Sequence, residues 1–386
     1  MVFTYKNGVT LYETGVPEAT GPRDFSLFMD STGTSRETGL AIVNTGQAKA
    51  NGILRLYDSD LQLLAQKDLS TLDPDFLPGH QVARYAWEIF PEIRQANIDR
   101  AVIAIESDQP LAAVTLRQND DPTKIFPQDV STLSTFPVVP GRADSVSQRP
   151  TEERVYYFPQ IGNGRIGQNQ FKTSLLFVNT GDDTELVVDF FNSQGLPLEI
   201  ELIGLGKSTS FRIPLKKGTF ATTETNGEGS IQAGYARVST NGSVGGTAVF
   251  GYSENGVTFF EAGVPASSAL RSFSVFVDTS GGVHQSGLAL VNVGSQPSRV
   301  TLRLVDSAYK QLALRTLDLG PGEHIARFAS ELFSQVLQNN IEHATIMVES
   351  EEPLSAVTLR QTDDPGMSYP KDVYLLTIFP VVPGAP

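Results

Sequence analysis

The chain contains a long internal repeat, and this feature constrains its fold more than any other. The segment Asn7-Gly8-Val9-Thr10 returns as Asn255-Gly256-Val257-Thr258, 248 residues later, and the same shift relates Asn44 to Asn292. Self-similarity on this scale is typical of a modular array of related domains, not of one large domain. At 386 residues the chain is also too long for a single hydrophobic core.

The repeat continues to the end of the chain after one change in length. Pro78-Gly79 matches Pro321-Gly322 at a shift of 243 residues, so the first copy carries a five-residue insertion within residues 70–77. The register then holds as far as Phe136-Pro137-Val138-Val139-Pro140, which returns as Phe379-Pro380-Val381-Val382-Pro383. Insertions of this size are tolerated in surface loops.

A third segment between the two copies is a more distant relative of both. Its run Leu175 to Gly181 echoes Leu40 to Gly46 in the first copy, and the parts that follow also correspond. We therefore expect three related domains in the order A, B, A. The expected division is a B-type closing hairpin at residues 1–16, domain A1 at 17–141, a linker at 142–155, domain B at 156–265 and domain A2 at 266–386.

The residue pattern predicts an all-β protein made of three tandem, related Ig-like β-sandwich domains. Short runs rich in Val, Ile, Phe and Thr are separated by turn residues at the spacing of such sandwiches. Asn241-Gly242 and Asn255-Gly256 predict tight hairpins, because Asn and Gly tolerate positive φ. Residues 83–90 and 326–333 have apolar residues at helical spacing, so we expect one short helix in each A domain. Residues 219–229 of B, at the same place, predict a strand or a loop.

Residues 1–16 match the closing hairpin of a B domain without its body, and two interpretations are open. The first is that the sequence begins inside a longer A–B–A–B array. The second is that the hairpin is an assembly strand that pairs with a neighbouring molecule, since unpaired strand edges favour such pairing. The residues that would carry this assembly are Val2, Phe3, Tyr5, Val9 and Leu11.

Charge and composition exclude several classes of partner. The net charge is −14, which argues against nucleic acids and against anionic membranes, because both select a basic surface. No apolar run approaches the ~20 residues of a membrane-spanning helix, so membrane insertion is not expected. There is no cysteine, which excludes disulfides and thiolate sites. Residues 1–12 alternate apolar and polar residues and do not form a signal peptide.

Motifs for catalysis fail on detail, and we expect no enzyme, no catalytic residue and no organic cofactor. Gly204 to Ser208 resembles the end of a phosphate-binding loop, but Glu201 stands where its first glycine is needed. Asp30 to Gly33 and Asp278 to Gly281 resemble aspartic-protease loops with one residue too many, so turns bonded by the Asp side chain are expected instead. The four histidines show no ligand spacing and are expected to be scattered on the surface: His80, His284, His324 and His343.

An acidic loop in each A domain is the best candidate for a metal site. Its carboxylates are Asp120, Asp121 and Asp129 in A1, and Asp363, Asp364 and Asp372 in A2. Three carboxylates in a ten-residue loop suit Ca²⁺, which takes six to eight oxygen ligands and accepts flexible loops. The alternative is a solvated turn, because Asp-Asp and Asp-Pro are common turn residues.

Two further groups of residues have an ordinary explanation beside a functional one. Arg117 and Arg360 end equivalent strands and are candidate ligand contacts, but pairing with Glu106 and Glu349 on a neighbouring strand is the ordinary expectation. The aromatic residues that form a candidate sugar-stacking platform are Tyr156, Tyr157, Phe158, Phe259 and Phe260. Packing in the core or between domains is the expectation for them.

The chain resembles the tandem Ig-like or fibronectin-III-like β-sandwich modules of bacterial surface and secreted proteins. The resemblance lies in the Leu-x-x-Val-Asn-x-Gly strand ends at Leu40 to Gly46 and Leu288 to Gly294, and in turns such as Tyr57-Asp58-Ser59. It departs from true immunoglobulin domains because there is no Cys and the single Trp, Trp87, lies in an expected helix. The resemblance implies a spacer, an adhesin or a fibre subunit outside the cell.

We therefore expect a non-enzymatic, extracellular or cell-surface protein with a structural or adhesive role. Its modules would stack into a stiff rod, and its partners would be other copies or neighbouring repeats, with head-to-tail filaments built through residues 1–16. The alternative is an array of carbohydrate-binding modules from a larger secreted protein, whose partners would be glycans.

Overall fold

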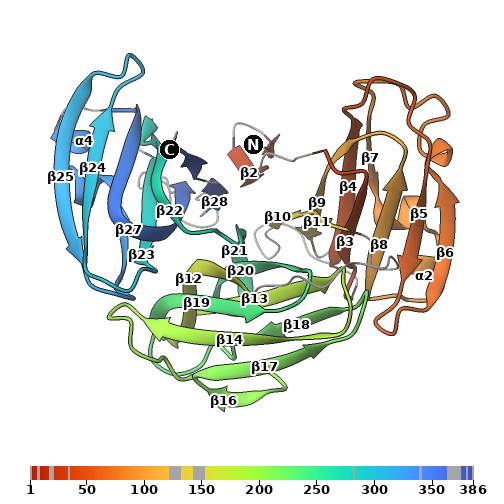
Figure 1. Cartoon of the computed structure of the whole chain (residues 1–386), viewed down its shortest axis with the longest axis horizontal. Helices are drawn as coiled ribbons and strands as arrows, with labels where there is room; N and C mark the ends of the chain where they lie inside the picture. The colour runs from red at the N-terminus through yellow and green to blue at the C-terminus, as the bar shows by residue number, and fades with distance from the viewer. Residues whose placement is uncertain are drawn as a thin grey trace.

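The computed structural model describes residues 2–6, 9–16, 21–33, 35–120, 132–141, 153–280, 283–338, 341–362, 375–379 and 381–384, and it confirms an all-β protein. The strands form pairs of packed sheets, which group into a first unit (residues 21–141), a middle unit (residues 153–269) and a last unit (residues 270–384) (Figure 1). A separate hairpin, β1 (Val2–Lys6) and β2 (Val9–Thr14), precedes the first unit.

The first unit has two sheets, with strand orders β10-β9-β4-β7 and β11-β3-β8-β5-β6. Its elements are β3 (Asp24–Asp30), β4 (Arg36–Asn44), β5 (Gly52–Tyr57), β6 (Leu63–Asp68), η1 (Leu69–Thr71), β7 (Gln81–Tyr85), α1 (Ala86–Ile89), α2 (Glu92–Gln95), β8 (Arg100–Ser107), β9 (Leu111–Asn119), β10 (Thr132–Pro137) and β11 (Val139–Pro140).

The middle unit repeats this plan, with β17-β14-β19-β12 as one sheet and β21-β20-β13-β18 as the other. Its strands are β12 (Arg154–Ile166), β13 (Asn169–Asn179), β14 (Thr184–Asn192), β15 (Ile200–Leu202), β16 (Gly206–Ser208), β17 (Ser210–Leu215), β18 (Phe220–Glu224), β19 (Gln232–Thr240), β20 (Val244–Glu254) and β21 (Val257–Pro265). The end of β12 pairs with β13, so the two sheets are continuous.

The last unit matches the first, except that one long strand, β27, takes the place of β8 and β9. Its residues before Leu354 pair with β22 and β24, and those after it pair with β23 and β28. The elements are β22 (Leu270–Asp278), β23 (His284–Asn292), β24 (Ser298–Val305), β25 (Gln311–Leu319), β26 (His324–Phe328), α3 (Ala329–Leu332), α4 (Gln335–Gln338), β27 (His343–Thr362), β28 (Leu375–Phe379) and β29 (Val382–Pro383).

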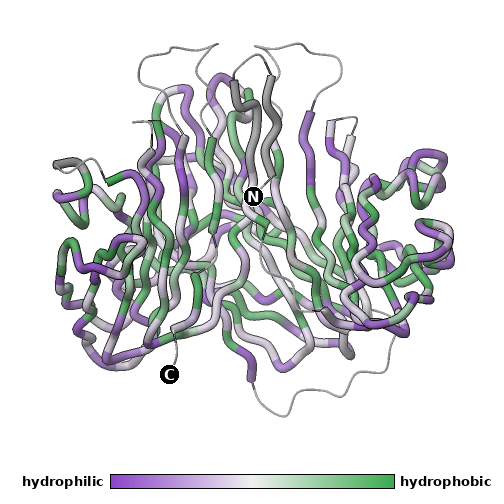
Figure 2. The backbone as a smooth tube through the Cα atoms, turned by 90° about the horizontal axis from the view of Figure 1, so that it is seen from above, coloured by the Kyte–Doolittle hydropathy of each residue, from purple (hydrophilic) through white to green (hydrophobic). Residues whose placement is uncertain are grey.

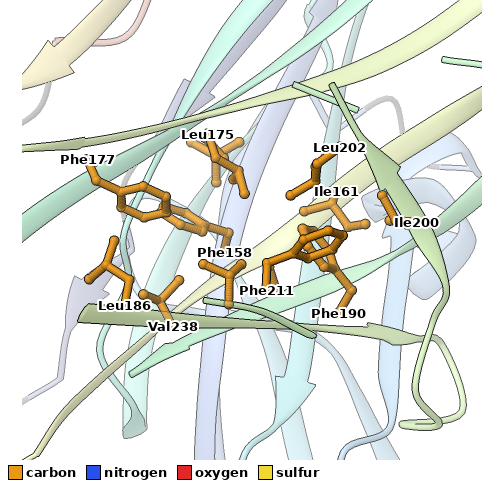
Figure 3. Packing of buried hydrophobic residues seen from close by; sticks show 14 of the residues in the cluster. Phe158, Ile161, Leu175, Phe177, Leu186, Phe190, Ile200, Leu202, Phe211 and Val238 are labelled. Carbon is orange, nitrogen blue, oxygen red and sulfur yellow. The ribbon is translucent and has the colours of Figure 1, made fainter. Parts of the chain in front are cut away.

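The core of each unit lies between its two sheets, as the alternation of apolar residues requires. In the middle unit, Phe158 and Val238 come from one sheet and Leu175 and Phe177 from the other, and all four are fully buried (Figure 3). Hydrophobic and hydrophilic stretches both occur along the strands when the molecule is seen from above (Figure 2). Burial alternates residue by residue along strands such as β4 and β17, which have one face on the core.

The Asn of the repeated Val-Asn-x-Gly motif holds the loop after it in all three units. In the middle unit, Asn179 Nδ2 donates to the carbonyls of Asp182 and Lys216 at 2.9 and 3.0 Å, and its Oδ1 accepts from Gly181 N at 2.9 Å. Asn44 and Asn292 make the corresponding bonds. The motif therefore has a structural role, because a buried amide must have its donors and acceptor satisfied.

Local details of two predictions are wrong. Residues 241–242 do not close a hairpin: β19 and β20 belong to different sheets, so this turn crosses the sandwich. Asn255-Gly256 does form the predicted tight turn, with φ of 52° and 79°. In each A domain the helical segment begins three residues later than expected, after an added strand, and a second short helix follows it. In B, the equivalent region forms strand β18.

The three units do not form the expected rod but curl around a common centre (Figure 1). Four strands meet there: β10 lies against β21, β21 against β28, β28 against β2, and β2 against β10. The hairpin expected to serve as an assembly strand thus places β2 within its own chain. The rod prediction fails because neighbouring units pack side by side through sheet faces, not end to end.

Candidate functional site

A cavity of about 490 Å³ lies between the middle and last units. The middle unit contributes Gln160, Asn169, Phe171, Phe250, Tyr252 and Phe260. The last unit contributes Gly287, Leu288, Ala289, Ala326, Arg327, Phe328, Glu331, Leu359, Gln361 and Leu376. Its size and its position between packed units are typical of small-ligand sites.

Aromatic side chains from three adjacent strands form one wall of this cavity. Phe171 on β13 lies directly across from Tyr252 on β20, which in turn lies across from Phe260 on β21. The Tyr252 ring centroid is 5.0 Å from that of Phe171 and 5.5 Å from that of Phe260. Phe250 stacks on Phe171 at 5.8 Å. Cross-strand pairing at alternate positions thus assembles a continuous aromatic surface.

Polar groups stand around the aromatic wall. Arg327 on β26 is exposed, and Glu331 on α3 uses one carboxylate oxygen to accept the backbone N–H of Phe328 at 2.7 Å. Gln160 Oε1 is buried and has no hydrogen-bond partner in the part of the chain that the structure describes. An unused acceptor in such a position is costly unless a ligand or water satisfies it. The cavity therefore combines an apolar wall with a few convergent polar groups.

A cluster of charges joins the first and middle units at a second, smaller cavity of about 270 Å³. Arg117 Nη1 donates to Asp30 Oδ2 at 3.2 Å, and its Nη2 lies 3.0 Å from Glu261 Oε2 as an ion pair without hydrogen-bond alignment. Burial disfavours the charged form of Asp30, but the nearby Arg117 and Thr32 outweigh burial and lower its pKa. The two carboxylates lie within ion-pair distance of Arg117, so we interpret the cluster as a structural contact between the units.

The prediction that Arg117 pairs with Glu106 is wrong, because β8 and β9 belong to different sheets. Glu106 instead pairs with Arg55 at 3.3 Å. Arg360, the equivalent of Arg117, donates to Asp278 Oδ2 at 2.6 Å and not to Glu349. The predicted turns bonded by Asp30 and Asp278 are confirmed: each accepts both the backbone N–H and the hydroxyl of the residue two positions later.

The histidines are not all on the surface. His324 is 3 % exposed where the last unit meets the middle unit, and its backbone N–H donates to the Ser193 carbonyl at 3.0 Å. Its ring lies 6.2 Å from that of Tyr235. Burial lowers the pKa of His324 to about 4, against a smaller opposing effect of the Pro159 carbonyl. Nothing in the local sequence distinguishes this histidine.

Most of the predicted calcium ligands lie outside the described residues: Asp121, Asp129, Asp363, Asp364 and Asp372. Asp120 is described, and its Oδ2 lies 3.5 Å from Gln118 Nε2. Within the described ranges no group of three His, Cys, Asp or Glu side chains is arranged to hold a metal. The calcium site stays a prediction. The assembly residues lie on β1 and β2, and only their backbones are described: Val2, Phe3, Tyr5, Val9 and Leu11.

The sequence identified part of the aromatic site. Of the candidate sugar platform, Phe260 lines the cavity, whereas Phe158 is fully buried in the core. Tyr156 is partly buried, and burial of its hydroxyl raises the pKa of that group. Phe171, Phe250 and Tyr252 were missed. The alternation of aromatic residues along β20 is a signal for them, but it does not show which sheet face meets another unit.

Comparisons with known proteins leave the family open. No family model and no curated protein matches the chain. Among solved structures it is similar to the Thermotoga maritima 1070 protein (14 % identity, 30 % of this chain and 97 % of that one, TM-score 0.23). It is also similar to SGBP-B of the Bacteroides ovatus mixed-linkage glucan utilization locus, solved with a mixed-linkage heptasaccharide (8 % identity, 89 % and 96 %, TM-score 0.13). Chicken CNTN1 FN1–FN3 domains are a further neighbour (9 % identity, 95 % and 100 %, TM-score 0.09).

Fibronectin and carbohydrate-binding proteins thus occur among the weak structural neighbours, and TM-scores this low carry no argument about function. The class that the fold itself defines is the all-β sandwich protein. No helix in the described ranges is long and apolar enough to cross a membrane.

Proposed function

We propose that this chain is a non-enzymatic, extracellular binding protein with a structural or adhesive role, and that the cavity between the middle and last units binds a carbohydrate. The observation that carries the proposal is the aromatic wall of Phe171, Phe250, Tyr252 and Phe260, facing polar groups of the last unit. The expected adhesive role and the alternative of glycan binding then describe one activity.

The chemistry of the cavity suits a sugar ring. The apolar face of a pyranose packs against aromatic rings, and its hydroxyl edge needs both donors and acceptors. Arg327 supplies donors, and Glu331 and Gln160 supply acceptors. A fully apolar ligand would leave Gln160 Oε1, which has no hydrogen-bond partner among the described residues, unsatisfied, and this is unfavourable.

The chain offers a matched control for testing this site. Arg327 in the cavity and Arg84 on the first unit are equivalent in the repeat, and both are exposed. We expect a glycan array to identify an oligosaccharide that the full chain binds, and calorimetry to show that Arg327→Ala weakens binding about tenfold. Arg84→Ala should leave the affinity unchanged. An array without any bound glycan, or equal effects of the two variants, would contradict the proposal.

Head-to-tail assembly through residues 1–16 remains a second proposal, supported by one observation. Within the described residues β1 pairs with β2 alone, so its other edge has no strand partner. Such an edge is able to add a strand from another molecule. Light scattering tests this: deletion of residues 1–13 should convert polymers into a folded monomer, and polymers that persist after deletion would argue against it.

A further inference from the structure

The hairpin β1–β2 occupies a position equivalent to that of β20–β21. The shift of 248 residues maps Val2–Lys6 onto residues 250–254, and the two hairpins share their strand register and a bulge at the same place. The contacts that they make are also equivalent. A Cβ on Gly263 would lie 2.4 Å from the Thr135 carbonyl oxygen of β10, and one on Gly15 would lie 1.9 Å from that of Ile378 on β28. β2 therefore packs on the last unit as β21 packs on the first.

The first and last units present equivalent faces, but only the face of the first unit is covered. Phe28 is 3 % exposed and packs edge-on against Phe220 of the middle unit, with ring centroids 5.1 Å apart. Its equivalent, Phe276, is 45 % exposed. Val139 is 9 % exposed, whereas its equivalent Val382 is 63 % exposed. Exposed apolar side chains at interface positions indicate a missing partner.

The loop between β5 and β6 and its equivalent between β24 and β25 also differ in exposure. Leu61 is half-buried and packs against the same hydrophobic cluster as Phe220, and it has an unusual positive φ of 60°. Its equivalent Tyr309 has φ of 59° but is 78 % exposed. The loop of the last unit thus has the same backbone conformation as the loop that makes the contact in the first unit, although none of the described residues covers it.

The other sheet face of the first unit is uncovered, whereas the equivalent face of the last unit is covered by the middle unit. In the last unit, Ala289 and Val357 are 1 % and 3 % exposed beneath the middle unit, while their equivalents Ala41 and Val114 are only half-buried. The first unit even carries the last unit's half of the candidate cavity. Every position that the last unit contributes there has its equivalent around a hollow on the first unit: Gly39, Leu40, Ala41, Ala83, Arg84, Tyr85, Glu88, Leu116, Gln118 and Leu133.

We propose that the space between the first and last units accepts a fourth β-sandwich of the middle-unit type, which runs into β1 and closes a four-membered ring. The middle unit carries both faces that this position requires, one that covers Phe28 and one that covers Ala289. Its strand β13 pairs with β20 along the edge that is open on the equivalent strand β1. Closure would also complete a second cavity like the candidate site, at the hollow of the first unit.

The test compares the chain with an extended chain, in which a copy of residues 153–249 is joined directly before Val2. This junction reproduces the connection into β20. Hydroxyl-radical footprinting reports the exposure of single side chains, and Leu314, which is 55 % exposed on β25, is the internal control. In the original chain Phe276, Tyr309 and Val382 should be labelled several times faster than Phe28, at a rate independent of protein concentration. Protection that increases with concentration would mean that a second copy covers the face, as head-to-tail assembly through β1 would require, and would overturn the proposal.

In the extended chain, labelling of Phe276 and Tyr309 should fall at least threefold while that of Leu314 is unchanged. Small-angle scattering should show a compact monomer. The substitution Phe276→Asp, made in the extended chain, should restore the labelling of Tyr309. Unchanged labelling with an extended arm in scattering would overturn the proposal. Glycan binding is not needed for any of these readouts, so failure of the ring and failure of the proposed function are distinguishable.

Discussion

Arg117 of β9 and Glu261 of β21 form an ion pair 3.0 Å long across the boundary between the first and middle units. The two side chains are 5 % and 10 % exposed, and Asp30 shares the guanidinium. Buried charges are tolerated only when paired, so the first and middle units are held in one relative orientation. On the last unit, the equivalent Arg360 and Asp278 pair with each other at 2.6 Å.

We expect Glu261→Gln to lower the free energy of unfolding by about 2 kcal/mol, because a buried guanidinium loses one of two carboxylates. Urea denaturation measures this change. The exposed pair between Arg212 and Glu185 is the control, and Glu185→Gln should change stability by less than about 0.5 kcal/mol. Equal effects of the two substitutions would show that the buried pair contributes no more than a surface pair.

Substitutions at Phe28 and Phe276 should differ strongly in the chain as it stands. Phe28→Ala removes a ring buried against Phe220 and should cost about 3 kcal/mol. Phe276→Ala removes a ring that is 45 % exposed and should cost less than about 1 kcal/mol. Thermal and urea unfolding of the two variants provide the comparison. A large cost at Phe276 would mean that its face is already covered in solution.

Stability should fall between about pH 6.5 and pH 4 because of His324. Its folded-state pKa of about 4 lies below the unfolded value of about 6.5, so the unfolded state binds the proton first. The contribution is fully present above pH 6.5 and is lost as the pH falls toward 4, by up to about 3 kcal/mol. Urea unfolding at several pH values should show this slope, and His324→Gln should flatten it. Gln is the residue at the equivalent position, Gln81.

If His324→Gln retains the full pH dependence, the buried imidazole is not its source.

Replacing the motif asparagine should destabilise whichever unit contains it. Asn179→Ala leaves the carbonyls of Asp182 and Lys216 and the N–H of Gly181 without their partner, and should cost about 3 kcal/mol. Asn44→Ala and Asn292→Ala should have similar effects. Asn51 is exposed and bonds to Asp108 at the surface, so Asn51→Ala should cost less than about 1 kcal/mol. Circular dichroism with urea measures all four.

Much of the architecture was predictable from the sequence because it depends on residues close together in the chain. Alternation in runs such as Leu186 to Phe190 predicted strands, and Asn255-Gly256 predicted a tight turn, because positive φ is a local property. The prediction of a hairpin at Asn241-Gly242 was wrong because it also depended only on this local property. A turn motif does not state whether the strands beside it pair with each other or belong to opposite sheets.

The sequence by itself determined the all-β class, the order of related segments and the Asp-bonded turns, since each follows from repetition or from contacts within a few residues. Only the tertiary structure decided that the units curl around a centre, that Glu261 is the partner of Arg117, and that His324 is buried. It also decided that Phe28 is covered while Phe276 is not. These properties depend on which sheet faces meet. Phe28 meets Phe220 from almost two hundred residues away, and the residue pattern along a strand shows that a face is apolar but not what covers it.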